Sequence, residues 1–200
     1  MNVGDSLRFG QRNFPDKEAL VFGSNRLTYA QLNRRVNGLA HSLLQLGMNK
    51  GDKAAIMLQN CSEYIEIYYA LAKIGAVAVP LNFMLKGKGL EFLANNSDSK
   101  IMFLEEQTRS EIECARDKLP QIQSDCYIYV GSEVPTGYRP YEELVAGATT
   151  DEPGVQVEED DDIVILYSSG TTGLPKGIVL THKTRLTYYN WCGLEYGMRF

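Results

Sequence analysis

Residues 53–81 read KAAIMLQNCSEYIEIYYALAKIGAVAVPL, and their pattern decides the fold class. The apolar run KAAIML is followed by the amphipathic stretch EYIEIYYALAKIG and then by a second apolar run, AVAVPL. The spacing predicts a helix that Ser62 caps and Gly75 ends, and Pro80 stops the second strand. A strand, a helix and another strand in this order are typical of one unit of a parallel sheet.

The same alternation extends to both sides of this stretch. Upstream, residues 27–47 (LTYAQLNRRVNGLAHSLLQLG) predict a helix in which Thr28 and Gln31 form a capping box and Gly47 marks the end. Downstream, the pattern predicts helices over 88–99 and 109–119 and strands over 100–104 and 126–130. We therefore expect an α/β fold with mainly parallel sheets covered by helices on both faces.

Residues 131–162 differ in character from the rest of the chain. They read GSEVPTGYRPYEELVAGATTDEPGVQVEEDDD, with one short helical piece at Tyr141–Val145 and five consecutive acids at Glu158–Asp162. The acidic run favours a solvated approach to the next strand over a metal-binding patch. We interpret 131–162 as a surface connection and not as a separate domain. A buried strand, DIVILYSS at 162–169, is predicted to follow it.

The composition excludes several classes of protein. The 200 residues carry a net charge of −5, which argues against binding nucleic acid through a basic surface. No apolar run approaches the roughly 18 residues of a membrane span, and the N-terminus lacks the apolar core of a signal peptide. The cysteines show no metal-ligand or disulfide spacing; they are Cys61, Cys114, Cys126 and Cys192. We expect a soluble, cytoplasmic protein with no integral membrane segment and no metal site of its own.

The chemistry is concentrated in YSSGTTGLPKGIVLTH, Tyr167–His182. A Walker A loop places its lysine after a glycine and opens a helix, but here Lys176 precedes Gly177 and the apolar run Ile178–Leu180 predicts a strand. The run KGKG at 86–89 also fails as a dinucleotide fingerprint, because Phe92 stands where the third glycine should be. Both common nucleotide motifs are excluded by spacing.

What remains is a strand, a loop and a strand, and the loop is rich in groups that bind phosphate. Glycines let backbone N–H groups turn inward, hydroxyls add neutral donors, and Lys176 adds one mobile positive charge. Such a loop suits the charge that builds up as pyrophosphate leaves. The alternative is a surface hairpin loop that is rich in Ser, Thr and Gly without binding anything.

Tyr167–His182 closely resembles the phosphate-binding signature of the adenylate-forming (AMP-binding) superfamily, which includes acyl-CoA synthetases, luciferases and peptide-synthetase adenylation domains. Residues 14–82, FPDKEAL through AVAVPLN, are similar to the N-terminal region of the same family. The resemblance implies that residues 1–200 are the N-terminal portion of the large AMP-binding domain. It also implies that the mobile C-terminal domain lies outside this chain.

The resemblance further implies a reaction. Enzymes of this family activate a carboxylic acid with ATP to an acyl-adenylate and then transfer the acyl group to a thiol, commonly that of coenzyme A. A fatty or aromatic acid, ATP with Mg²⁺, and coenzyme A are therefore the expected ligands, with the Mg²⁺ ligand beyond residue 200. A homo-oligomer is compatible with the sequence. An acid–thiol ligase is the implied enzyme class.

The family pattern also implies roles for individual residues. Thr171 and Lys176 are the implied catalytic residues, and His182 is implied to lie near the acyl site, although a histidine hydrogen-bonded at the end of a strand fits equally well. The residues implied to surround the β- and γ-phosphates are Ser168, Ser169, Gly170, Thr171, Thr172, Gly173 and Lys176. Phe83 and Thr184 depart from the family pattern, at positions where relatives commonly carry proline and asparagine.

Two readings of a different class stay open beside this one. The chain can be a non-catalytic fragment, or a split half that docks to a partner chain and exposes the apolar surface that a partner would cover. On either reading, and on the enzyme reading too, we expect the isolated 200 residues to be inactive, because the groups that fix adenine and metal are not among them.

Overall fold

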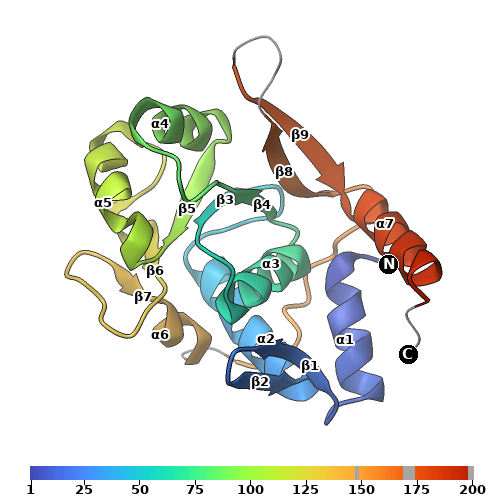
Figure 1. Cartoon of the computed structure of the whole chain (residues 1–200). Coiled ribbons are helices and arrows are strands. Elements are labelled where there is room, and N and C mark those ends of the chain that lie inside the picture. The colour runs from blue at the N-terminus through green and yellow to red at the C-terminus, as the bar shows by residue number, and fades with distance from the viewer. Residues whose placement is uncertain (147–148, 169–173, 198–200) are drawn as a thin grey trace.

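The computed structural model describes residues 1–146, 149–168 and 174–197 and shows one dominant sheet (Figure 1). Within these residues, seven strands lie in the order β7-β6-β5-β3-β4-β8-β9. Every neighbouring pair is parallel except β8 and β9, which are antiparallel. The strands are β3 (Lys53–Met57), β4 (Val77–Pro80), β5 (Ser99–Leu104), β6 (Tyr127–Tyr129), β7 (Arg139–Pro140), β8 (Asp162–Ser168) and β9 (Lys176–Thr181). The predicted α/β fold with a mainly parallel sheet is confirmed.

Helices cover both faces of this sheet. The chain steps from β3 to β4 in one direction and from β4 past β3 to β5 in the other. Because parallel crossovers are right-handed, α3 must lie on one face and α4 and α5 on the opposite face, as Figure 1 shows. The helices are α1 (Val3–Asn13), α2 (Tyr29–Gln45), α3 (Ser62–Ile74), α4 (Gly87–Asn96), α5 (Glu106–Ala115), α6 (Tyr141–Ala146) and α7 (His182–Glu195).

The ends of α2 and α3 test the predicted caps. At the start of α2, the Thr28 hydroxyl accepts the Gln31 N–H at 3.2 Å and the Gln31 side chain accepts the Thr28 N–H at 2.8 Å, so the capping box is confirmed. The prediction that Ser62 caps α3 is wrong by one residue, because Cys61 holds that position without a side-chain bond. The Ser62 hydroxyl instead accepts a hydrogen bond from Asn25 at 3.0 Å.

Two elements near the N-terminus lie outside the predicted pattern. Helix α1 buries Val3 and Leu7 against the rest of the molecule and begins with a capping box. Strands β1 (Glu18–Phe22) and β2 (Asn25–Thr28) form an antiparallel hairpin of their own beside α2 (Figure 1). Both elements pack on the face of the sheet that α2 and α3 cover.

Residues 131–162 do more than connect. Strand β7 adds to the edge of the sheet beside β6, and α6 packs against α2 with Tyr141 fully buried. We call residues 141–146 and 149–161 the strap, because they run from α6 along α2 to the start of β8 (Figure 1). The predicted surface connection is thus an integrated part of the fold.

The strap is held by polar side chains of α2. The Ser42 hydroxyl donates to the carbonyl of Leu144 at 2.6 Å, and the Asn37 amide donates to the carbonyl of Thr150 at 2.8 Å. The His41 ring makes a third bond, at 2.9 Å, to the carbonyl of Asp151. These bonds satisfy main-chain carbonyls that lie outside regular structure, which is a requirement for packing a loop closely on a helix.

A buried ammonium group fixes the same segment. Lys73 of α3 donates to the side-chain oxygens of Asn33 and Asn37, each at 2.7 Å, and to both carboxylate oxygens of Glu152, at 2.9 and 2.7 Å. Burial lowers the pKa of Lys73, and its bonds to Glu152 oppose that shift. The pKa of Glu152 lies below its usual value, because the hydrogen bonds from Lys73 and Asn33 outweigh burial, which acts in the opposite direction.

Gly38 of α2 provides a test of how closely the strap packs. A Cβ atom at this position would lie 2.3 Å from the carbonyl oxygen of Val145, a main-chain atom that cannot turn away. We expect Gly38→Ala to lower the free energy of unfolding by about 1–3 kcal/mol, although alanine normally favours a helix over glycine. Urea denaturation measures the change.

Gly193 in α7 is the matched control, because a Cβ atom there would meet nothing within 4 Å. Gly193→Ala should raise the stability by up to about 1 kcal/mol, as expected for a helical glycine in open space. If both substitutions stabilise the protein, the strap does not pack on α2 as described.

Candidate functional site

The predicted phosphate signature includes the end of β8 and the start of β9, which pair as an antiparallel hairpin at one edge of the sheet (Figure 1). Ser168 ends β8, Lys176 begins β9, and the two residues pair across the hairpin, both exposed to solvent. The predicted strand–loop–strand is therefore confirmed. The predicted site residues Ser169, Gly170, Thr171, Thr172 and Gly173 lie outside the described residues.

The hairpin is more exposed than the sequence predicts. Ile163 and Val164 at the start of β8 are buried, but Leu166 is 38% exposed, and Ile178 and Val179 of β9 are each 50% exposed. The prediction that β8 is a buried strand is therefore wrong for its second half. Strand β9 is an edge strand of the sheet, so among the described residues it pairs with β8 alone.

Two contacts fix the strand that leads into the loop. The Tyr167 hydroxyl donates to the side-chain oxygen of Asn96, at the end of α4, at 2.8 Å. Opposite Tyr167, a Cβ atom on Gly177 would lie 2.9 Å from the side chain of Ile165 and 3.3 Å from the ring of Tyr167. A side chain at position 177 would collide with Ile165 and crowd the Tyr167 ring. Glycine at this position therefore lets the Tyr167 ring lie across the hairpin, next to Ser168.

The position of Lys176 suits an anionic ligand. Among the described residues, no carboxylate lies within ion-pair distance of its side chain. An exposed ammonium at the mouth of a loop can reach a phosphate oxygen by rotating its four-carbon stem. Lys176 and the hydroxyl of Ser168 thus flank the loop from opposite strands.

The structure places His182 apart from Ser168 and Lys176, at the other end of the hairpin. His182 is fully buried, and its Nδ1 accepts the main-chain N–H of Val3 at 3.1 Å, at the start of α1. Its own N–H donates to the carbonyl of Asp161 at 3.0 Å. Burial lowers the pKa of His182 to about 4, so the ring is neutral at pH 7. A role for His182 in substrate binding stays a prediction.

A second possible site lies on the carboxyl edge of the sheet, where open α/β sheets usually bind ligands. The crevice between β3 and β5 is the topological switch point of the sheet, because the connections that leave these two strands run to helices on opposite faces. Here the carboxylate of Glu105 accepts the N–H of Gln59 at 2.6 Å, and Thr108 donates to the carbonyl of Met57 at 2.9 Å. Both polar side chains are therefore already bound to the main chain at the end of β3.

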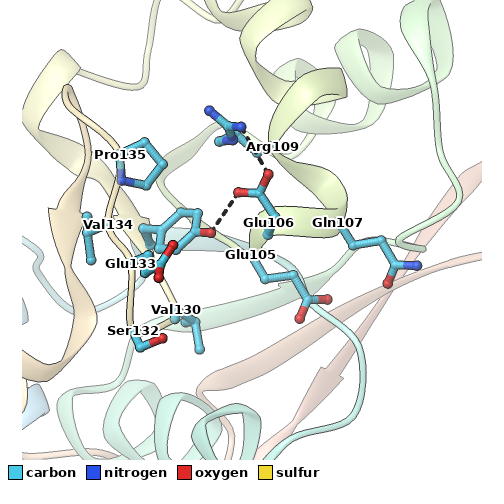
Figure 2. Close-up of a pocket in the computed structure, with 11 residues that line it drawn as sticks. Glu105, Glu106, Gln107, Arg109, Val130, Ser132, Glu133, Val134 and Pro135 are labelled. Carbon is cyan, nitrogen blue, oxygen red and sulfur yellow. Dashed lines mark hydrogen bonds and ion pairs between the residues drawn. The ribbon is translucent and has the colours of Figure 1, made fainter.

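Next to it, a cavity of about 750 Å³ opens beyond the ends of β5 and β6 (Figure 2). Three of its polar groups already bind one another: Glu106 accepts hydrogen bonds from Tyr129 and from Arg109, each at 2.9 Å (Figure 2). The bonds from Arg109 and then Tyr129 lower the pKa of Glu106. The cavity lies on the β6 side of the sheet, and the phosphate hairpin lies on the opposite side.

The described ranges contain neither a cluster of metal-binding side chains nor a helix that could span a membrane. No group of three Cys, His, Asp or Glu side chains there could hold a metal ion. None of the described helices is both long and apolar enough to span a bilayer.

Burial raises the pKa of Cys61, at the start of α3, to about 12, which makes this thiol a poor nucleophile.

Comparison with known proteins assigns the fold and the hairpin to a family. Residues 8–199 match the family of AMP-binding enzymes. The chain belongs to this family. The match includes the hairpin that carries the phosphate signature, so the sequence resemblance is confirmed.

Individual relatives support the same assignment. The long-chain-fatty-acid–CoA ligase FadD13 of Mycobacterium tuberculosis is 35% identical over 187 residues, which are 92% of this chain and 35% of that protein. The anthranilate CoA ligase AuaEII, solved with anthranoyl-AMP, superposes with a TM-score of 0.87 at 27% identity, over 96% of this chain and 37% of that one. The N-terminal domain of FACL13 from M. tuberculosis gives a TM-score of 0.81 at 35% identity, with coverages of 90% and 44%. The chain spans about a third of the length of the curated relatives it matches.

The burial of His182 generates a pH-dependent prediction. Its pKa is about 4 in the folded protein and about 6.5 in the unfolded chain, so the unfolded chain binds more protons between these values. The stabilisation is complete above pH 6.5 and is lost as the pH falls toward 4, by up to about 3 kcal/mol. Urea unfolding at half-unit pH steps measures the slope.

His182→Asn is the control, because an amide oxygen can accept the Val3 N–H without titrating. The variant should lose the slope between pH 6.5 and 4 and keep the carboxylate-driven slope below about pH 4.5. Parallel curves for the variant and the natural chain would rule out His182 as the source.

Proposed function

We propose that these residues are the N-terminal portion of the large domain of an acyl-CoA synthetase. Such an enzyme uses ATP to convert a carboxylic acid to an acyl-adenylate and pyrophosphate, and then passes the acyl group to coenzyme A. The observation that carries the proposal is the β8–β9 hairpin, which holds the signature loop between Ser168 and Lys176. The membership of the AMP-binding enzyme family and the names of the ligase relatives support it.

In this proposal the loop grips the part of ATP that leaves. The backbone and hydroxyls of 168–173 surround the β- and γ-phosphates, with Thr171 in direct contact. Lys176 follows the negative charge that grows on pyrophosphate as the carboxylate attacks the α-phosphate. The neutral donors of the loop bind phosphate oxygens without bringing further buried charges into the site. Lys176 supplies the one positive charge. We place the Mg²⁺ ligand outside these 200 residues, and no step here depends on it.

The proposed acid is fatty or aromatic, in keeping with relatives named for long-chain fatty acids and for anthranilate. We propose a cytoplasmic enzyme with this acid, ATP and coenzyme A as its small-molecule partners, and His182 on the side of the acyl group. The isolated chain is proposed to be inactive, because it spans about a third of the length of its ligase relatives.

A docking role is the second candidate, and one observation favours it. Helix α7 exposes Tyr188, Trp191 and Leu194, which are 53, 55 and 84% exposed, beside the half-exposed β9. A non-catalytic fragment or split half would cover such a surface with a partner chain or with a second copy. Sedimentation of the purified chain distinguishes self-association from a monomer.

Phosphate binding by the hairpin is testable on the 200-residue chain itself. We expect tripolyphosphate to shift the backbone amide NMR signals of Ser168 and Lys176 with millimolar affinity, because the loop is present without the groups that bind adenine. Lys176→Ala should weaken binding at least threefold by removing the cation at the loop. Lys183→Ala is the control, since Lys183 is a cation beyond the other end of β9 that pairs with Glu159 at 3.1 Å. Equal weakening by both variants would mean that the anion binds through general charge alone.

The proposed role of Lys176 also predicts how the two half-reactions respond. The intact mass of the native gene product first shows which form of the protein to assay. In a form that turns over, Lys176→Ala should slow ATP–pyrophosphate exchange far more than thioester formation from preformed acyl-adenylate, because only the first step releases pyrophosphate. Equal slowing of both steps would contradict this role.

A further inference from the structure

A smaller cavity, of about 280 Å³, lies between α3, the end of β4, β8 and α7. Its wall is aromatic and aliphatic, with a single charged residue, Arg185, in the first turns of α7. The residues that line it include Tyr64, Tyr68, Pro80, Leu166, Arg185 and Tyr189. The cavity is distinct from the phosphate hairpin tip and from the cavity of Figure 2, with which it shares no residue.

Arg185 is held in place but not neutralised. Its guanidinium donates to the hydroxyl of Tyr189 at 3.1 Å and lies 5.0 Å from the centre of the Tyr189 ring and 5.7 Å from that of Tyr188. Within the described residues no carboxylate forms an ion pair with Arg185, and its Nε atom is shielded from solvent without a well-formed hydrogen bond. A guanidinium so positioned is ready to donate to an anion.

A second donor lines the same cavity from a different helix. The hydroxyl of Tyr68, on α3, is also buried without a partner in the described residues. Tyr68 and Arg185 interact electrostatically with each other, and neither the Tyr68 hydroxyl nor the Arg185 Nε makes a well-formed hydrogen bond, so both keep donors for an oxygen acceptor at this wall.

The remaining wall determines the rest of the ligand. Three tyrosine rings, a proline and aliphatic side chains offer nothing to a polyphosphate, but they suit a flat apolar body. The volume lies below the range for drug-sized ligands, which begins at about 300 Å³, so the body is small.

We propose that this cavity binds the carboxylate of a small aromatic acid. Arg185 and the hydroxyl of Tyr68 donate to its two oxygens, and its ring packs among the tyrosines from α3 and α7. The binding needs no nucleotide. The proposal rests on the proposed function only if the bound acid is the one that the enzyme activates. An acid that acts as an effector would bind to the same groups.

The test is an NMR titration of the 200-residue chain with benzoate and phenylacetate, without ATP, with Trp191 fluorescence as a second readout. The neutral analogues benzamide and benzyl alcohol are titrated beside them. We expect saturable binding of the acids and at least tenfold weaker binding of the neutral analogues. Arg185→Met should weaken acid binding at least tenfold and leave the neutral analogues unchanged, and Tyr68→Phe should weaken it two- to fivefold.

Lys183→Met is the matched control, because Lys183 lies two residues away and pairs with Glu159 outside the cavity. It should leave acid binding unchanged. The absence of saturable binding to the natural chain, equal affinity for benzoate and benzamide, or equal losses in Arg185→Met and Lys183→Met would overturn the proposal. If Arg185→Met does not fold, intermolecular NOEs from the ligand ring to Tyr68 and Tyr189 decide the question on the natural chain.

The titration also separates this proposal from the proposed function. It contains no nucleotide, so a failure of the hairpin to bind tripolyphosphate leaves its result intact. In a form of the protein that turns over, an acid that binds the cavity and stimulates ATP–pyrophosphate exchange is the acid to be activated. An acid that binds without stimulating exchange is a separate effector.

Discussion

The structure depends most on one buried ammonium group, that of Lys73. An isolated charge at this depth would cost several kcal/mol, and it is tolerated because Asn33, Asn37 and both oxygens of Glu152 surround it. These partners come from α2 and from the strap, while Lys73 itself comes from α3. Lys73 has three N–H donors for these four acceptor oxygens, so they share its donors and together fix three segments at once.

From this point the strap carries the constraint to the functional hairpin. After Glu152, the carbonyls of Gln156 and Val157 accept hydrogen bonds from Lys50 and Asn2, each at 3.3 Å. Lys50 also forms an ion pair with Asp161 at 2.6 Å, immediately before β8 begins. The base of the phosphate hairpin is therefore tied to the turn before β3 and to the start of α1, and His182 adds a bond between the far end of β9 and α1.

Local signals in the sequence predict what depends on neighbouring residues, and they fail where distant residues decide. The capping box of Thr28 was predictable because both partners lie within one turn, whereas the role of Ser62 depends on Asn25, which is 37 positions away. The strap could not be predicted, because Asn37 and Ser42 have the sequence pattern of residues on the solvent face of a helix.

The candidate sites show the same division. The hairpin was predictable from its hydroxyls, glycines and lysine, since these residues are contiguous. The cavity at Arg185 combines residues from α3, β4, β8 and α7, spread along the chain from Tyr64 to Tyr189, and no spacing in the sequence brings them together. The partial exposure of β8 also depends on its place near the edge of the sheet, which the apolar run DIVIL does not reveal.

The shallow pairing of β8 with the sheet has a mechanical consequence. Within the described residues, β8 joins β4 at one register position, Ala78 with Val164, and Ser168 lies four residues beyond it. Beyond Val164, β8 is therefore held to the sheet only through β9, and Ser168 lies about 13 Å from Val164. A rotation of about 10° of the hairpin about Val164 would move Ser168 by about 2 Å. The hydrogen bond from Tyr167 to Asn96 restrains this rotation, so a shift of α4 would move the end of β8 that leads into the phosphate signature.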